Sequence, residues 1–271
     1  MLIIGEKING TLKKTASAIT GRDCDFIRDL ALRQVRAGAA YLDVNAGTGG
    51  GKEAEDLVWL VNTVQDAVDV PLCLDSADPA VIGVAMAHVK HTPMINSISG
   101  EQARLDGILP LAKDKGSPVI ALLLDDAGIP VDVEKRLTIA MRIIHQTRKA
   151  GLPDSHVYVD PLALAVSTRQ DGALIALETI RALKRECPEI KFCMGLSNVS
   201  FGLPARTLVN QAFIAQAILA GLDAAIMNPM EQGLVNMIYA TELVLGRDRF
   251  CRHYTQAFRS GMIDPNPAAR S

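Results

Sequence analysis

The sequence has few aromatic residues and no excess of positive charge. Tryptophan, tyrosine and phenylalanine make up 4% of its 271 residues, and the formal net charge at pH 7 is -2. Proteins that bind DNA or RNA need a basic surface and often use aromatic side chains as stacking platforms. This composition therefore argues against nucleic acid as a partner.

Long apolar runs are also missing. No hydrophobic stretch reaches the roughly 20 residues that a membrane-spanning helix requires. The N-terminal sequence MLIIGEKING lacks the cationic start and long apolar segment of a secretory signal. We therefore expect a cytoplasmic protein that does not enter a membrane.

Cysteine is present but never at the spacing of a metal or redox motif. The five cysteines are Cys24, Cys73, Cys187, Cys193 and Cys251, and no CxxC pair occurs. This pattern argues against a zinc ribbon, an iron–sulfur cluster and a dithiol centre. We expect no metal site and no intrinsic cofactor.

Apolar segments typical of β-strands alternate with segments of helix length. Eight strands are predicted, at residues 2–8, 40–46, 71–76, 93–99, 118–124, 156–161, 191–197 and 224–229. Helices are predicted between them, for example at 23–37, 78–90, 133–150, 170–187 and 204–220. Eight strands in this alternation predict an α/β fold of the (β/α)8 TIM-barrel type. An open doubly wound sheet is the alternative, but the first turn, KINGTLKK, lacks the glycine pattern of a dinucleotide-binding loop.

A single domain is expected. No linker rich in proline, glycine or serine divides the chain, and one barrel commonly takes this length. The predicted domain covers residues 1–263. The last segment, 264–271, reads DPNPAARS and lacks apolar periodicity, so we expect a disordered tail or a remnant of cloning.

Polar side chains recur at the predicted carboxyl ends of the strands, where the active site of a TIM barrel lies. These residues are Glu6, Asn9, Asp43, Asn45, Asp75, Asn96, Ser97, Asp125, Asp126, Asp160, Ser197, Asn198 and Asn228. Any one of them is explained as well by a helix cap or a turn. Their recurrence over several strands predicts a pocket of carboxylates and amides, which suits a ligand that presents N–H donors, such as a pterin ring.

Six motifs resemble the pterin-binding methyltransferases, in order along almost the whole chain. They are GEKIN, LDVNAG, LCLDS, INSIS, VDPL and GLSNVSFGLP. Within that group, the chain is most similar to the methyltetrahydrofolate:corrinoid/iron–sulfur protein methyltransferases of anaerobic one-carbon metabolism. The resemblance implies a homodimeric barrel that takes the N5-methyl group of methyltetrahydrofolate. The implied acceptor is a Co(I) corrinoid (cobalamin) on a separate protein. That protein is either the corrinoid/iron–sulfur protein of acetyl-CoA synthesis or the corrinoid protein of an O-demethylase system.

The resemblance also assigns roles to residues. It implies that Asp75, Asn96 and Asp160 hold the pterin, that Asn198 reaches its N5 region, and that Arg206 lies near the ligand. Further pocket candidates are Glu6, Asn9, Asp43, Ser97, Gly195 and Ser197. An amide at position 198 is suited to catalysis because it can donate a hydrogen bond to N5 as the carbon–nitrogen bond breaks. No histidine stands at a predicted strand end, so we expect the proton to arrive through water.

The sequence leaves three alternative functions. Dihydropteroate synthase uses a similar barrel, but the seventh-strand segment GLSNVSFG has no lysine at the place expected for that enzyme. A non-catalytic folate-binding or corrinoid-docking module is a second alternative, although a pure binder has no need of a donor at N5. The segment GTGGGK resembles a phosphate-binding loop, but Ala46 replaces its first glycine and Glu53 follows its lysine.

Overall fold

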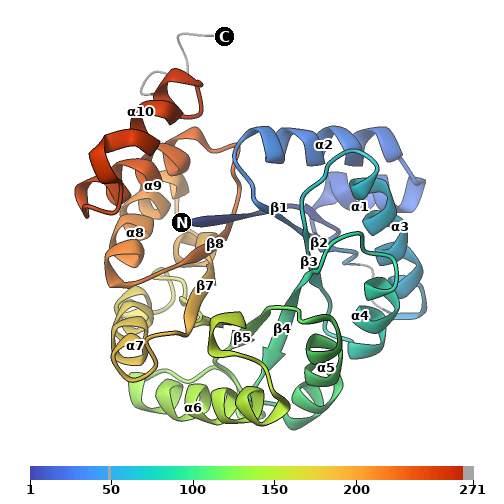
Figure 1. Cartoon of the computed structure of the whole chain (residues 1–271), viewed down its shortest axis with the longest axis horizontal. Helices are drawn as coiled ribbons and strands as arrows, with labels where there is room; N and C mark the ends of the chain where they lie inside the picture. Colours follow the sequence, from blue (N-terminus) through green and yellow to red (C-terminus); the bar gives the residue numbers. More distant parts are fainter. Residues whose placement is uncertain (48–49, 265–271) are drawn as a thin grey trace.

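The computed structural model describes residues 1–47 and 50–264, and its strands form a closed barrel (Figure 1). Each strand pairs in parallel with the next along the chain, and the last pairs with the first. The strands are β1 (Leu2–Asn9), β2 (Tyr41–Asn45), β3 (Leu72–Asp75), β4 (Met94–Ser99), β5 (Val119–Leu122), β6 (Val157–Asp160), β7 (Lys191–Gly195) and β8 (Ala224–Met227). The predicted (β/α)8 barrel is confirmed.

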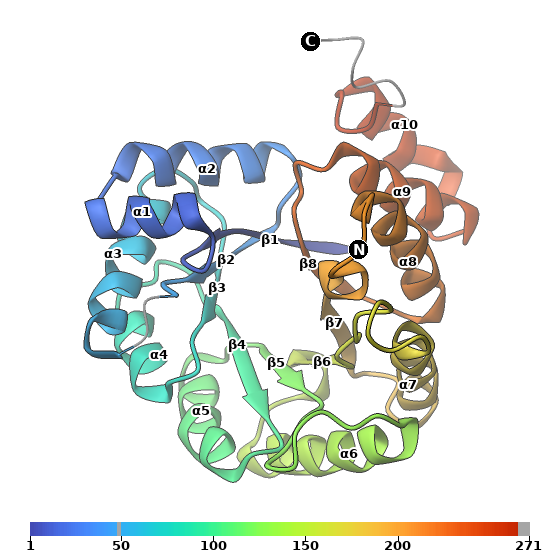
Figure 2. The same ribbon diagram turned by 180° about the vertical axis from the view of Figure 1, so that it is seen from behind.

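Helices surround the barrel, and one further helix lies outside the ring beside the C-terminus (Figure 2). They are α1 (Lys13–Gly21), α2 (Cys24–Arg36), α3 (Glu53–Gln65), α4 (Pro79–Met86), α5 (Gln102–Lys115), α6 (Val133–Ala150), α7 (Gly172–Glu186), α8 (Arg206–Ala220), α9 (Gln232–Val244) and α10 (Arg252–Arg259). None of the described helices is both long and apolar enough to cross a membrane.

Local signals in the sequence set the ends of α6. The Asp132 side chain accepts a hydrogen bond of 2.8 Å from the backbone N–H of Lys135 and so caps the first turn. The helix ends at Gly151, whose φ of 89° lies in the left-handed region that favours glycine. The observed helix therefore has the bounds that the sequence predicts.

Helix α4 is shorter than predicted. The sequence predicts a helix over 78–90, but the helix ends at Met86. Beyond it, the Gln65 side chain donates to the backbone carbonyl of His88 (3.0 Å) and accepts from the backbone N–H of Lys90 (2.6 Å). These long-range hydrogen bonds replace helical ones, and nothing in the local sequence reveals them.

Two apolar layers stabilise the barrel. The inner layer fills its centre with fully buried side chains from several strands, namely Ile4, Cys73, Met94, Ile120, Cys193 and Ala224. The outer layer lies between strands and helices and forms the larger core. Because apolar side chains fill the centre of the barrel, a polar ligand can bind only at the ends of the strands.

Two segments discussed from the sequence, the GTGGGK loop and the C-terminal tail, include residues that the structure does not describe. Residues 48 and 49 lie within the GTGGGK segment, and residues 265–271 make up most of the predicted tail. Asp264, the first residue of that tail, is described: its backbone N–H donates to Asn236 Oδ1 (3.1 Å), and its carbonyl accepts from Asn236 Nδ2 (2.7 Å).

Candidate functional site

A polar cavity of 330 Å³ opens at the carboxyl ends of the strands. Its size lies within the range of pockets that hold small molecules. It is lined by Glu6, Lys7, Asn9, Thr11, Leu12, Asp43, Asp75, Asn96, Gly195, Ser197, Asn198 and Ile226. The cavity therefore gathers side chains from β1 to β4 on one side and from β7 and β8 on the other.

Two amide–carboxylate hydrogen bonds orient the Asp43 and Asp75 carboxyl groups of this cavity. Asn96 Nδ2 donates to Asp43 Oδ1 (3.1 Å), and Asn45 Nδ2 donates to Asp75 Oδ2 (2.8 Å). The strand register explains the second pair, because Asn45 lies opposite Asp75 in the β2–β3 ladder. Asp75 in turn lies opposite Asn96 in the β3–β4 ladder. Each carboxylate is thus oriented by an amide from a nearby strand.

Burial makes these carboxylates reluctant to ionise. The Asp43 side chain is fully enclosed, and burial raises the pKa of its carboxyl well above the usual value; the charge of Asp75 raises it further. Burial likewise raises the pKa of Asp75, although the Asn45 hydrogen bond opposes the shift. The pKa of Glu6 is also raised by burial. Such a group of acids favours a ligand that donates hydrogen bonds.

Asp160 lies at the end of β6 and is 6% exposed. Its Oδ1 accepts from the backbone N–H of Leu162 (2.7 Å), and its Oδ2 accepts from that of Gly195 (3.3 Å). Burial raises the pKa of Asp160 to about 6, even though both hydrogen bonds and Arg136 favour the charged form. The protonation state of this carboxyl therefore changes around pH 6.

Asn198 stands on a short 3-10 turn, η3 (Leu196–Ser200), directly after β7. Its side chain is exposed, and it lines the same cavity as Asp43 and Asp75. Arg206 stabilises this turn, because its Nη2 donates to the carbonyl of Ser197 (2.6 Å) and its Nε to Ser200 Oγ (3.0 Å). The guanidinium thus binds the turn itself, and a ligand contact by Arg206 stays a prediction.

Most of the residues predicted for the site line one cavity. Among the residues given a role or named as pocket candidates, Asp160, Ser97 and Arg206 lie outside its lining. Four further strand-end residues also lie outside it, namely Asn45, Asp125, Asp126 and Asn228. Ser97 is buried, with 4% exposed. Asp160 is joined to the cavity wall through the backbone of Gly195.

Sequence reasoning missed four residues of the lining, namely Lys7, Thr11, Leu12 and Ile226. Strict alternation along a strand puts neighbours on opposite faces, so Glu6 and Lys7 are not expected to share a cavity. The register of β1 against β2 shifts between Gly5 and Ile8, which breaks the alternation at this point. The sequence carries no signal for that shift.

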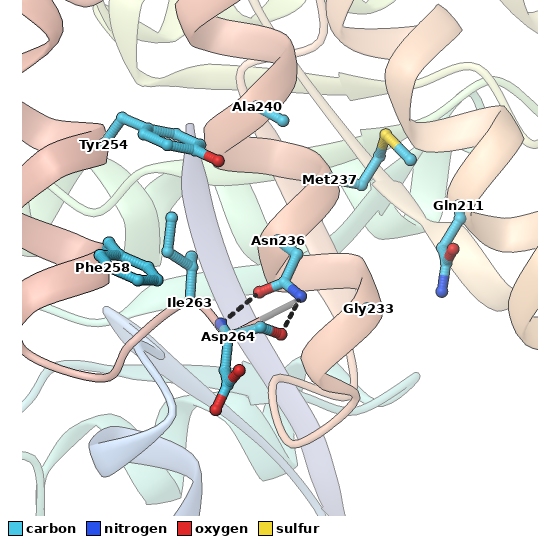
Figure 3. Close-up of a pocket in the computed structure, with 9 residues that line it drawn as sticks. All are labelled: Gln211, Gly233, Asn236, Met237, Ala240, Tyr254, Phe258, Ile263 and Asp264. Atoms are coloured by element: carbon cyan, nitrogen blue, oxygen red, sulfur yellow. Dashed lines mark hydrogen bonds between the residues drawn. The ribbon is translucent and has the colours of Figure 1, made fainter. Parts of the chain in front are cut away.

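A second cavity, of 410 Å³, lies on the outside of the barrel among α8, α9 and the C-terminal segment (Figure 3). It is lined by Gln211, Gly233, Asn236, Met237, Ala240, Tyr254, Phe258, Ile263 and Asp264. Figure 3 shows the Asn236 amide directed at the backbone of Asp264, where it makes two hydrogen bonds. Among the described residues that line this cavity, Asp264 contributes the one carboxylate, whereas Glu6, Asp43 and Asp75 all line the strand-end cavity, which is therefore the stronger candidate for chemistry.

An eight-stranded barrel with a cavity of acids and amides at its strand ends defines a small-molecule enzyme of the (β/α)8 class. Residues 5–228 match the family model described as pterin binding enzyme. The chain therefore belongs to the pterin binding enzyme family, and the resemblance to pterin-binding methyltransferases is confirmed.

Several known proteins are similar to the chain. It is 40% identical over 267 residues to the methylcorrinoid:tetrahydrofolate methyltransferase of Eubacterium limosum, and the match covers 98% of both chains. It is 31% identical over 242 residues to the methionine synthase of Mycobacterium tuberculosis, covering 84% of this chain and 20% of that longer protein. The Yersinia pestis dihydropteroate synthase with a pterine-sulfa conjugate superposes with a TM-score of 0.71 at 19% identity, covering 91% and 94% of the two chains. This last likeness shows the fold alone.

Proposed function

We propose that the protein transfers a methyl group between N5 of a tetrahydrofolate and the cobalt of a corrinoid bound to another protein. The observation that carries this proposal is the strand-end cavity, whose lining combines the carboxyl groups of Asp43 and Asp75 with the Asn198 amide. The 40% identity to a protein named for methylcorrinoid and tetrahydrofolate supports the same reaction.

The carboxylates are suited to the donor edge of a pterin, which carries a ring N–H and an amino group. Asp75 accepts one hydrogen bond from Asn45, and Asp160 accepts two from backbone N–H groups. An ionised carboxylate accepts up to about four hydrogen bonds, so both retain capacity for a ligand. We assign the pterin edge to Asp75, Asn96 and Asp160.

The Asn198 amide can serve transfer in both directions. When the methyl group leaves for Co(I), the electron pair of the broken bond stays on N5 and a proton joins it; the amide N–H stabilises that developing charge. In the reverse direction, N5 attacks the methyl group on cobalt, Co(I) departs and the proton leaves N5. Before this attack, the Asn198 amide oxygen can accept a hydrogen bond from the N5–H group. The name of the Eubacterium limosum relative puts the methylcorrinoid first, as the donor.

The partner protein must approach the mouth of the barrel, because the methyl group is passed there. Large apolar side chains are exposed on the loops at this end: Ile129 and Val131 after β5, and Phe201 after β7. Phe201 is 66% exposed and follows the Asn198 turn directly. We assign these side chains to the contact with the corrinoid protein.

A homodimer is part of the proposal. Helices α8, α9 and α10 carry exposed large apolar side chains, namely Leu208, Leu219, Val244 and Phe258. Of these side chains, Phe258 lines the outer cavity of Figure 3. A second copy that covers these side chains leaves the strand-end cavity open. The cytoplasmic location and the lack of an intrinsic cofactor stay predictions from the sequence.

One experiment tests the function directly. Methyltetrahydrofolate and a reduced corrinoid protein are mixed with the purified protein in a stopped-flow instrument, and the Co(I) absorbance is followed. The reverse mixture contains methylated corrinoid protein and tetrahydrofolate. We expect rapid transfer in at least one direction. No transfer in either direction, with tight folate binding retained, would favour the non-catalytic binding module instead.

A further inference from the structure

Gly195 lies between two residues of the proposed site. It is the last residue of β7, and its backbone N–H donates to Asp160 Oδ2 (3.3 Å). On its other side, Asn198 Nδ2 lies 3.0 Å from the point that a Cβ atom on Gly195 would occupy. The amide therefore lies where a side chain on residue 195 would crowd it.

The backbone of residue 195 does not require glycine. Its φ of -70° and ψ of 95° are allowed for residues with side chains. Gly202, in the loop that follows, is different because its φ of 79° is left-handed. What is special about Gly195 is thus the missing side chain rather than an unusual conformation.

The Asn198 backbone is held more firmly than its side chain. The backbone carbonyl accepts from the N–H of Phe201 (3.1 Å), and Arg206 holds the neighbouring Ser197 carbonyl. Within residues 1–47 and 50–264, the Asn198 side chain makes no hydrogen bond, and it is exposed. Its position is therefore sensitive to any atom added beside it, and a Cβ atom on Gly195 would be such an atom.

We propose that Gly195 is a positioning residue for methyl transfer: its missing side chain gives the Asn198 amide its place beside the end of β7. This inference rests on the proposed function. A Cβ atom 3.0 Å from Nδ2 is closer than ordinary van der Waals contact allows, so the amide must shift by a few tenths of an ångström. Since no internal hydrogen bond resists the shift, the fold tolerates it while the hydrogen bond to N5 lengthens.

The first test is Gly195→Ala. We expect single-turnover methyl transfer at saturating folate to slow roughly tenfold, because small misplacements of a catalytic group are costly. The Kd for methyltetrahydrofolate should stay within about twofold, since the amide acts mainly in the transition state. Gly21→Ala is the matched control, because a Cβ there meets no atom within 4 Å. Parent-like transfer by Gly195→Ala would overturn the inference.

A double-variant cycle separates positioning from general damage. With Asn198→Ala, the atoms that a Cβ on residue 195 would meet are absent, since Asn198 Nδ2 and Cγ are the only atoms of the described residues within 4 Å of it, apart from those of its chain neighbours. Gly195→Ala should then cause no further loss. If Gly195→Ala alone fails to fold, adding Asn198→Ala should restore folding. A further rate loss in the double variant, or a failure to restore folding, would overturn the inference.

The side-chain amide signal of Asn198 gives a readout that does not depend on activity. In a ¹⁵N spectrum it is assigned by its loss in Asn198→Ala, and Gly195→Ala should shift it while Gly21→Ala leaves it unmoved. If the parent protein transfers no methyl group, the proposed function fails, yet this shift still tests the contact. An unmoved signal in Gly195→Ala would contradict the inference even where the parent is active.

Discussion

Asn45 donates a hydrogen bond of 2.8 Å to Asp75, its direct neighbour across the β2–β3 ladder. This hydrogen bond opposes the rise in the pKa of Asp75 that burial causes. Asn45 therefore helps to keep Asp75 ionised and fixes its orientation. Asn45 lies at the end of β2, and in the proposed function it affects the ligand indirectly, by orienting Asp75.

The first prediction concerns this pair. Asn45→Ala should raise the pKa of Asp75 and weaken methyltetrahydrofolate binding about fivefold to tenfold, the effect of losing a hydrogen bond worth about 1–1.5 kcal/mol. Titration calorimetry at pH 7 measures it. Asn62→Ala, on the exposed side of α3, is the control and should bind as the parent does. Equal folate affinities for Asn45→Ala and the control would show that Asp75 binds the ligand equally well without the hydrogen bond from Asn45.

The second prediction concerns the Asp160 carboxyl. Its pKa of about 6 is raised by burial, so the group is ionised above pH 6 and protonated below it. The ionised form accepts more hydrogen bonds, and folate affinity should therefore fall as the pH is lowered from 7 to 5.

Asp160→Ala should bind folate at least tenfold more weakly at pH 7 and should lose the share of the pH dependence that Asp160 supplies. Because the pKa values of Asp43, Asp75 and Glu6 are raised too, the difference between parent and variant is the measured quantity. Asp126→Ala, an exposed acid on the loop after β5, is the control. An unchanged Kd for folate in a folded Asp160→Ala protein would show that Asp160 does not bind the ligand and only accepts hydrogen bonds from the backbone of Leu162 and Gly195.

These residues also show how far the sequence reaches. Strand positions could be predicted because the apolar runs are short and regular, and polar residues at strand ends then pointed to one face of the barrel. Arg206 was predicted near the ligand, but its guanidinium holds the η3 turn. Lys7 entered the cavity through a register shift. The Lys7 position depends on pairing between β1 and β2, which are distant in sequence. The Arg206 hydrogen bonds are local, to residues six and nine positions earlier, and a ligand contact by Arg206 stays a prediction.

The third prediction concerns the docking of the partner. Phe201→Ala removes an exposed side chain at the barrel mouth while the backbone hydrogen bonds of residue 201 remain. The kcat/KM with a corrinoid protein should fall about fivefold to tenfold, as for a contact worth about 1 kcal/mol or more. Transfer to free reduced cobalamin should not change. Leu174→Ala, exposed on α7, is the control. An equal loss with free cobalamin would show that Phe201 acts inside the site instead.

The last prediction concerns Asn198, on which the mechanism depends. If its amide stabilises charge on N5 mainly in the transition state, Asn198→Ala should slow methyl transfer by roughly 10²–10³, as for removal of one preorganised donor. Folate affinity should fall much less. Asn198→Asp sharpens the test because an ionised carboxylate cannot donate a hydrogen bond, whereas the protonated acid can. Its residual rate should therefore rise as the pH falls, while the rate of Asn198→Ala shows no such rise. Single-turnover rates between pH 5 and 8, with Asn62→Ala as the control, decide the matter: transfer by Asn198→Ala at the parent rate would remove the amide from the mechanism and leave proton delivery to water alone.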